Sequence, residues 1–122
     1  MKAEILLWYK RDCSTCKNTR DMLCDFSTEE FHYLEEKLTK KKLLDLLRLL
    51  QIPASGLVRK KEKLYREKYE GKKMTEAAWI KAFLEHPVLI ERPIIIYGDR
   101  AVIGRPPEKA WDILPRRGMN KS

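Results

Sequence analysis

The chain has 122 residues, of which 43% are hydrophobic and 36% are charged. This length and composition predict one globular domain with its own hydrophobic core and exclude a disordered chain. The formal net charge is +8, which fits an anionic substrate, an acidic partner or nucleic acid. No apolar run approaches the ~20 residues of a membrane span, and the apolar stretch near the start is too short for a signal peptide. We therefore expect a cytoplasmic protein without membrane association.

The pattern begins with a strand and then a helix. The apolar run 4–9 is typical of a buried strand. A helix is expected to start at 13–15 and to continue through Cys24. Ser14 and Thr15 suit its first turn, because their side-chain oxygens can accept hydrogen bonds from the first backbone N–H groups.

A short second strand is expected at 31–34, before a long helical stretch. Apolar periodicity and breaker residues then predict three helices, over 38–50, 62–69 and 75–84. Thr39 and Thr75 are the expected N-terminal caps of the first and third of these helices.

The last third of the chain predicts a hairpin and a final helix. The run 93–97 is the clearest strand, and 101–103 is expected to pair back on it through a turn at Gly98-Asp99. A helix is expected over 107–114, with proline in its first turn, and the tail 115–122 is expected to be loose.

The order of these elements predicts an α/β fold. Without the middle helices, the remaining βαβ–ββα pattern is that of a thioredoxin-like sandwich with a mixed four-stranded sheet. We therefore expect a single domain over 1–122 that carries a helical insertion at about 38–85.

Cys13 and Cys16 form a CxxC pair at the predicted junction of strand and helix. A helix N-terminus offers partial positive charge and unpaired N–H donors, which favour a thiolate and can also hold an oxyanion. Cys13 is the candidate nucleophile and Cys16 a candidate second catalytic thiol; two cysteines without a role are the alternative. Three cysteines in total do not indicate a disulfide framework, and we expect Cys24 to be a core residue.

Three arginines at predicted strand or loop boundaries are candidates for oxyanion binding: Arg59, Arg92 and Arg105. Taken alone this signal is weak, because the segment 59–73 carries a net charge of +5 and most of its basic residues are expected on a solvated helical face. No nucleic-acid-binding motif accompanies them, so direct nucleic-acid binding is not expected. A single CxxC without a second pair gives no zinc pattern, and no metal is expected.

Three stretches resemble the arsenate reductase family of the glutaredoxin-linked type, which also contains the Spx transcriptional regulators. They run from Trp8 through the CxxC to Thr19, over 56–59, and from Glu85 to Glu108. The likeness extends from Glu4 to about Leu114.

The resemblance implies a thioredoxin-like fold and a reductase cycle. In the family, a cysteine matching Cys13 attacks arsenate, glutathione adds as co-substrate, and glutaredoxin resolves the mixed disulfide to release arsenite. Three family arginines that bind the oxyanion match Arg59, Arg92 and Arg105, and a cis proline facing the cysteine matches Pro93. The implied partners are arsenate or another oxyanion and a glutaredoxin or thioredoxin, with no bound cofactor; we expect a monomer.

The chain also departs from the family pattern. Tyr9-Lys10-Arg11 replaces a His-Asn-Pro run, and Cys16 creates a CxxC as in the Spx regulators. We therefore rank an arsenate reductase-like enzyme first, supported by Arg105, which the regulators generally lack. A redox-sensing regulator that binds the RNA polymerase α subunit comes second, and a general dithiol reductase using Cys13 and Cys16 third.

Overall fold

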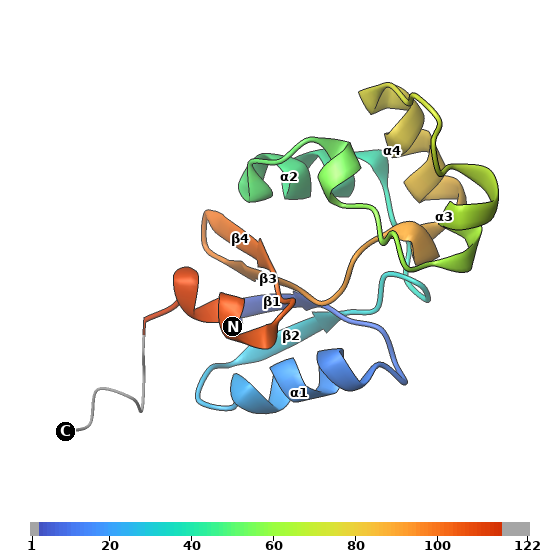
Figure 1. The fold of residues 1–122 in the computed structure, drawn as a ribbon. Helices are drawn as coiled ribbons and strands as arrows, with labels where there is room; N and C mark the ends of the chain where they lie inside the picture. Colours follow the sequence, from blue (N-terminus) through green and yellow to red (C-terminus); the bar gives the residue numbers. More distant parts are fainter. Residues whose placement is uncertain (1–2, 116–122) are drawn as a thin grey trace. The chain divides into compact units, whose positions relative to one another are not determined.

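Four short strands form one mixed sheet in the computed structural model, which describes residues 3–115. They are β1 (Ile5–Trp8), β2 (Thr28–Phe31), β3 (Ile94–Tyr97) and β4 (Arg100–Ile103). Their order across the sheet is β2-β1-β3-β4 (Figure 1). β1 runs parallel to β2 and antiparallel to β3, and β3 and β4 form an antiparallel hairpin, so the predicted mixed four-stranded sheet is confirmed.

The register brings four chain segments to one edge of this sheet. Trp8, at the end of β1, lies opposite Phe31 at the end of β2 and Ile94 at the start of β3. Ile94 in turn lies opposite Ile103, the last residue of β4. The segments that follow β1, β2 and β4 and the segment that precedes β3 therefore meet at this edge, where both cysteines of the CxxC and two of the candidate arginines belong.

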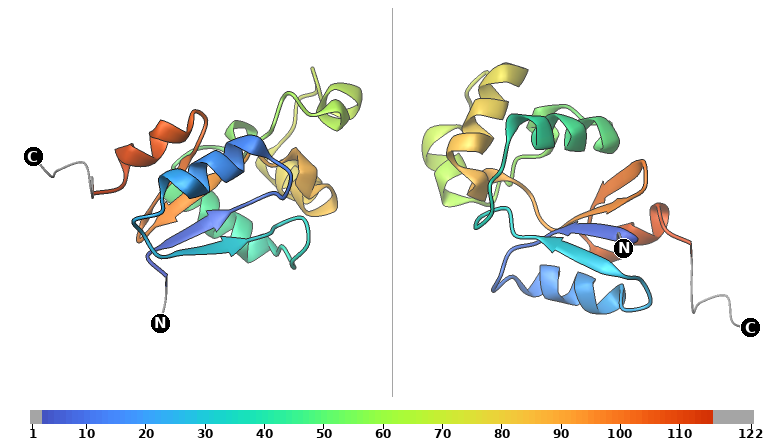
Figure 2. Two further views of the ribbon diagram at one scale, coloured as in Figure 1. Left: turned by 90° about the horizontal axis from the view of Figure 1, so that it is seen from below. Right: turned by 180° about the vertical axis from the view of Figure 1, so that it is seen from behind.

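A helix and a 3₁₀ helix cover one face of the sheet (Figure 2). α1 (Ser14–Met22) and η3 (Pro107–Asp112) contact each other. Their buried side chains share one core cluster with the inward residues of β1 and β3, which are Ile5, Leu7 and Ile95. β1 lies between β2 and β3, and most of its side chains are buried. Its sequence is therefore an unbroken apolar run.

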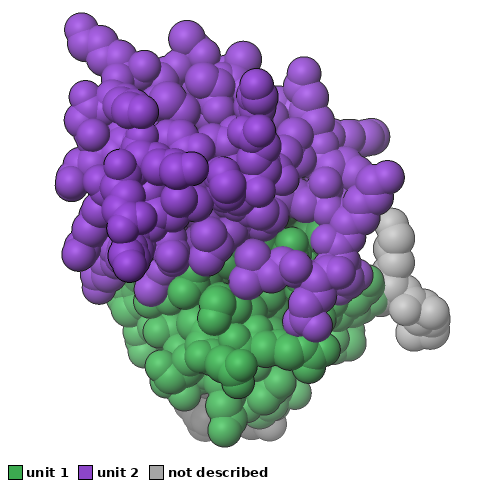
Figure 3. Space-filling model, turned by 90° about the vertical axis from the view of Figure 1, so that its right-hand side faces the viewer, with its two compact units in different colours: residues 1–33, 92–122 green, residues 34–91 purple. Residues whose placement is uncertain are grey.

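The chain divides into two compact units, one of residues 1–33 with 92–122 and one of residues 34–91 (Figure 3). The first unit holds the sheet with α1 and η3. The second is helical, with α2 (Lys40–Leu50), η1 (Ala54–Gly56), α3 (Lys63–Lys68), α4 (Glu76–Glu85) and η2 (Pro87–Leu89). The predicted insertion at about 38–85 falls within the second unit; that the chain is a single domain stays a prediction.

The predicted helices of the second unit are confirmed with small shifts of their ends. Thr39 and Thr75 cap α2 and α4 through their side-chain oxygens, as expected. α3 buries none of its residues, which agrees with a solvated basic face. Within residues 3–115, no helix combines the length and the apolar character that crossing a membrane requires.

Three predictions about the first unit are wrong in part. The second strand is at Thr28–Phe31 rather than 31–34, because pairing with β1 recruits polar edge residues that carry no apolar signal. The last helix is a 3₁₀ helix that ends at Asp112. Cys24 is exposed and not part of the core, because α1 ends two residues before it. The predicted loose tail lies, from residue 116 onward, outside the described residues.

Candidate active site

Cys13 is the N-cap residue of α1, as the sequence predicts. Its backbone is extended (φ −111°, ψ 114°), and its Sγ accepts a hydrogen bond from the backbone N–H of Cys16 at 3.4 Å. A thiolate at this position faces the positive end of the helix and the unpaired N–H donors of its first turn. Cys13 is half-buried, so its sulfur remains reachable by a small substrate.

Three contacts hold the side chain of Arg105 beside Cys13. Its Nη2 lies 3.8 Å from Sγ of Cys13, and its Nη1 donates to Oγ1 of Thr15 at 3.3 Å. Its Nε donates to the backbone oxygen of Arg92. A guanidinium held at three points presents its N–H groups in a fixed direction, which is what paired recognition of an oxyanion requires.

Arg92 is a buried cation beside the same thiol, with only 8% of its surface exposed. Its side chain hydrogen-bonds to Cys13 and acts on it electrostatically. It also hydrogen-bonds to the phenol of Tyr33, which is 1% exposed. A buried charge needs such partners, and here the partners include the candidate nucleophile.

These neighbours push the pKa values of the two thiols apart. Partial burial of Cys13 favours its neutral form, but hydrogen bonds from Cys16 and Arg92 and the charge of Arg92 outweigh burial and lower the pKa of Cys13. Burial, together with the adjacent Cys13 thiol, raises the pKa of Cys16 to about 12. The pair therefore consists of an accessible thiol that ionises readily and a buried thiol that stays protonated and donates a hydrogen bond to Cys13.

Pro93 and Gly104 lie next to the two arginines and contact each other. The Arg92–Pro93 and Arg105–Pro106 peptide bonds are both cis. The backbone N–H of Gly104 donates to the oxygen of Pro93 at 2.8 Å. A side chain at Gly104 would place its Cβ 2.7 Å from Cδ1 of Ile95 and 3.2 Å from Cγ of Pro93, so glycine permits the close approach that sets the position of the next residue, Arg105.

Arg59 lies in the second unit and is held by contacts there. Its backbone N–H donates to the oxygen of Leu89 at 2.7 Å, and its Nη1 pairs with Glu91 at 3.1 Å. Its side chain is 17% exposed, unlike the solvated basic side chains of α3. The structure thus brings together Cys13, Cys16, Arg92 and Arg105 in the first unit, and the place of Arg59 in the site stays a prediction.

Sequence reasoning missed Thr15 and Tyr33 as members of the site. Thr15 was expected only as a helix-start residue, yet its hydroxyl also accepts from Arg105. Tyr33 follows β2 and hydrogen-bonds to Arg92. Its position in the apolar run 31–34 signalled burial, but no local pattern signals a partner 59 residues away.

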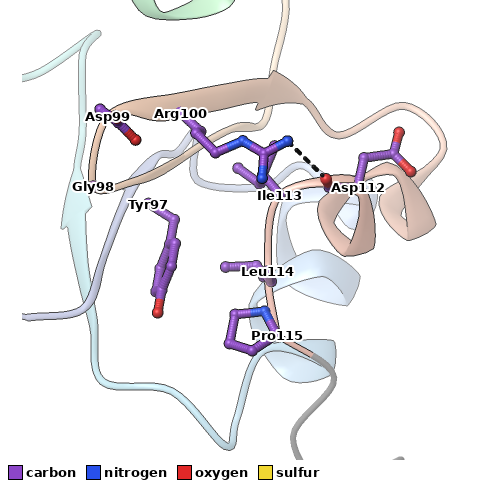
Figure 4. Close-up of a pocket in the computed structure, with 8 residues that line it drawn as sticks. All are labelled: Tyr97, Gly98, Asp99, Arg100, Asp112, Ile113, Leu114 and Pro115. Atoms are coloured by element: carbon purple, nitrogen blue, oxygen red, sulfur yellow. Dashed lines mark hydrogen bonds between the residues drawn. The ribbon is translucent and has the colours of Figure 1, made fainter.

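A separate open pocket lies elsewhere in the first unit (Figure 4). It has a volume of about 430 Å³ and is lined by residues 97–100, which join the end of β3 to the start of β4, and by the segment 112–115. Nη2 of Arg100 donates to the backbone oxygen of Asp112 across it, at 3.4 Å. None of the candidate site residues lines this pocket. Across residues 3–115, no three side chains gather in a way that would hold a metal ion.

Comparison with known proteins matches the chain almost end to end. The model of the ArsC family matches residues 8–113. The protein named "Uncharacterized protein YfgD" of Escherichia coli (strain K12) is 34% identical over 118 residues, covering 93% of this chain and 99% of the relative. The arsenate reductase of the same strain is 33% identical over 116 residues, covering 93% and 82%. The solved arsenate reductase from Vibrio cholerae superposes with a TM-score of 0.86 at 30% identity, covering 93% and 100%. This likeness confirms the predicted thioredoxin-like fold.

Proposed function

Because the chain belongs to the ArsC family, we propose that it is an arsenate reductase-like thiol oxidoreductase with Cys13 as its nucleophile. The observation that carries this function is the contact of Arg105 with the Cys13 sulfur at the N-terminus of α1. One place thus combines a thiol of lowered pKa with fixed donors for an oxyanion.

The first step is attack of the Cys13 thiolate on arsenic. A sulfur–arsenic bond forms, one arsenate oxygen leaves as water after protonation, and arsenic stays pentavalent. The N–H groups of the first α1 turn and the guanidinium groups of Arg92 and Arg105 hold the remaining oxygens. This arrangement stabilises the negative charge in a partly water-excluded place, where such donors are most effective.

The second step uses glutathione as co-substrate. Its thiolate attacks the Cys13 sulfur, the sulfur–arsenic bond breaks, and the electron pair of that bond stays on arsenic, which leaves as arsenite. The remaining Cys13–glutathione disulfide is reduced by a glutaredoxin-type protein, which regenerates the thiol. The chemistry needs no prosthetic group, because the two electrons come from thiols.

We assign further roles by the same reasoning. Arg59 is the third oxyanion-binding arginine, and its pairing with Glu91 would orient it. Pro93 helps to position Arg105, because its backbone oxygen accepts a hydrogen bond from Gly104, the residue before Arg105. Both assignments extend the family pattern to residues that match it in this chain.

The decisive assay is arsenate-dependent oxidation of NADPH in a system coupled through glutathione, glutathione reductase and glutaredoxin. We expect turnover by the wild-type protein and none by Cys13→Ser. The exposed Cys24→Ser is the matched control and keeps wild-type turnover. A wild-type protein that oxidises no NADPH with arsenate, while its thiols are shown to be reduced, contradicts the proposed function.

The Cys13–Cys16 pair favours two further candidates, a general dithiol reductase and a redox-sensing regulator, in which arsenate takes no part. The buried and protonated Cys16 next to an ionisable Cys13 is the arrangement of a dithiol reductase or of a redox sensor. Reduction of a model disulfide by the protein tests the reductase. Binding to the C-terminal domain of the RNA polymerase α subunit tests the regulator. Either positive result, in a protein that does not turn over arsenate, would replace the assignment as an arsenate reductase.

A further inference from the structure

The two thiols of the CxxC lie in direct contact within the first turn of α1. Cys16 donates from its backbone N–H to Sγ of Cys13 at 3.4 Å, and the two side chains are also hydrogen-bonded to each other. Two cysteines at this spacing place both sulfurs within reach of one small atom, which is why C-x₂-C recurs as a ligand pair in metal sites. In the proposed reductase cycle only Cys13 bonds to arsenic, and the sulfur of Cys16 forms no bond to it.

We propose that Cys13 and Cys16 together bind trivalent arsenic, as arsenite, in a two-sulfur chelate. Trivalent arsenic is a soft centre, and soft centres prefer thiolate ligands to oxygen or nitrogen. The inference deepens the proposed function, because arsenite is the product of that reaction. It stands on the thiol pair itself, so the protein binds arsenite whether or not it turns over arsenate.

The binding step is a ligand exchange without change of oxidation state. Arsenous acid, As(OH)₃, reacts with two thiols; two sulfur–arsenic bonds form, two arsenic–oxygen bonds break, and each thiol proton leaves with a hydroxide as water. The product carries arsenic bound to both sulfurs and one hydroxyl. No oxidant or reductant is consumed, and the high pKa of Cys16 is no obstacle, because its proton passes to the departing hydroxide.

The surroundings favour chelation over attachment to Cys13 alone. Cys13 is the accessible sulfur and forms the first bond; the second is then an intramolecular step at high effective concentration. Cys16 has no exposed surface, so a sulfur–arsenic bond at that position is shielded from water. The third cysteine, Cys24, is exposed and lies beyond the end of α1, which makes it a control within the same chain.

The test titrates the reduced protein with sodium arsenite and follows the mass of the complex by native mass spectrometry. A phosphine reduces the cysteines and is removed before the titration; dithiothreitol is avoided, since it is itself a dithiol that competes for arsenic. We expect one arsenic per chain and a mass gain equal to arsenous acid less two waters, because each sulfur–arsenic bond that forms releases one water. Cys24→Ser should bind with unchanged affinity and show the same mass gain.

Cys16→Ser and Cys13→Ser should each weaken arsenite binding roughly a hundredfold, because each loses the intramolecular second bond. Circular dichroism checks that the variants are folded; if serine is not tolerated at the buried Cys16, the half-buried Cys13→Ser carries the test alone. Wild-type affinity in either folded variant, or a mass gain in the wild type that shows the loss of only one water, overturns the chelate. The titration contains no arsenate, so this result is independent of the turnover assay for the proposed function.

Discussion

The side chain of Arg105 links the first turn of α1 to the residue that precedes Pro93. It contacts the sulfur of Cys13, the hydroxyl of Thr15 and the backbone of Arg92. Arg92 contributes the buried charge that acts most directly on the thiol. We therefore expect different roles for the two arginines: Arg92 lowers the pKa of Cys13, and Arg105 is held in a direction that suits binding of the substrate.

We predict that Cys13 ionises below the pH expected for a free thiol, because its hydrogen bonds and the charge of Arg92 favour the thiolate. The rate of alkylation by iodoacetamide should therefore rise with pH around a midpoint below ~8.5 and fall at more acid pH as the thiolate is protonated. The Cys24→Ser protein removes the exposed competing thiol from the measurement. A midpoint at or above the free-thiol value in that protein would count against activation of Cys13.

We predict that Arg92→Ala and Arg105→Ala weaken oxyanion binding by roughly ten- to a hundredfold. A charge-assisted hydrogen bond contributes ~1.5–3 kcal/mol, which corresponds to this range. Lysine should rescue binding only in part, because it cannot form the paired contact. Calorimetry with arsenate or sulfate measures the effect.

Arg100→Ala is the matched control, because Arg100 is an arginine of the same unit that contacts Asp112 instead of the cysteines. We expect it to bind the oxyanion like the wild type. Arg59→Ala should weaken binding like the other two substitutions if Arg59 is the third ligand. Unchanged affinity in both Arg92→Ala and Arg105→Ala would remove the oxyanion site.

At the scale of elements, the first turn of α1 and the exit of β4 shape the site. Cys13 is the N-cap of α1, and Thr15 and Cys16 lie in its first turn. β4 ends at Ile103, and Gly104 then passes closely over Pro93, so the chain delivers Arg105 to the end of α1. The contact between Arg105 and Cys13 requires both elements.

We predict that peroxide forms a Cys13–Cys16 disulfide, because the spacing brings the two thiols together across the first turn of the helix. Mass spectrometry of the oxidised, non-reduced protein should show this intramolecular bond, and dithiothreitol should reverse it. Cys24→Ser should oxidise in the same way. Detection of only intermolecular or glutathione adducts would show that Cys16 does not resolve Cys13 and would favour the cycle with external glutathione.

We predict that Gly104→Ala lowers the free energy of unfolding by about 1–3 kcal/mol, because the added methyl group overpacks a filled region. Its Cβ would lie 2.7 Å from Cδ1 of the fully buried Ile95. Gly56→Ala is the control, since its nearest contact is 3.3 Å, to the side chain of Ile52, and we expect a smaller loss. Urea unfolding measures both; equal stability of Gly104→Ala and wild type would contradict the close approach.

For the whole molecule, charge and exposed surface are the relevant quantities. The excess of positive charge is concentrated in a segment whose helix, α3, buries no residue. Among the described residues, only two large hydrophobic side chains are exposed, Leu34 at 39% and Leu44 at 47%. Scattered apolar residues of this kind are normal on a monomer and do not form an extended apolar interface.

We therefore predict that the protein is a monomer in solution. Light scattering coupled to size-exclusion chromatography should give the mass of one chain in the presence of a reductant. The reductant matters because the exposed Cys24 could link two chains by a disulfide. The Cys24→Ser protein should give the same mass without it, and a dimer mass in reduced Cys24→Ser would contradict the prediction.

The elements with local signals can be predicted from the amino-acid sequence. The apolar runs at β1 and β3 predict strands because they are short and bounded by polar or turn residues, and Thr39 and Thr75 cap helices because their side chains reach the first N–H groups. The placement of Cys13 at the start of α1 also followed from local pattern, since a polar turn separates the first strand from the helix. Hydrophobic periodicity and capping depend on residues that are close together in the sequence, so the sequence of a single protein is enough to identify them.

Which distant residues meet depends on how the chain folds in three dimensions. β2 lies three residues earlier than predicted because backbone pairing with β1, rather than its own polar side chains, makes it a strand. Cys24 is exposed because the helix ends before it, and Tyr33, which follows β2, belongs to the site because it hydrogen-bonds to Arg92. The contact of Arg105 with Cys13 spans 92 positions of the chain. Such contacts depend on strand order and register, which long-range packing sets and which no local pattern of residues encodes.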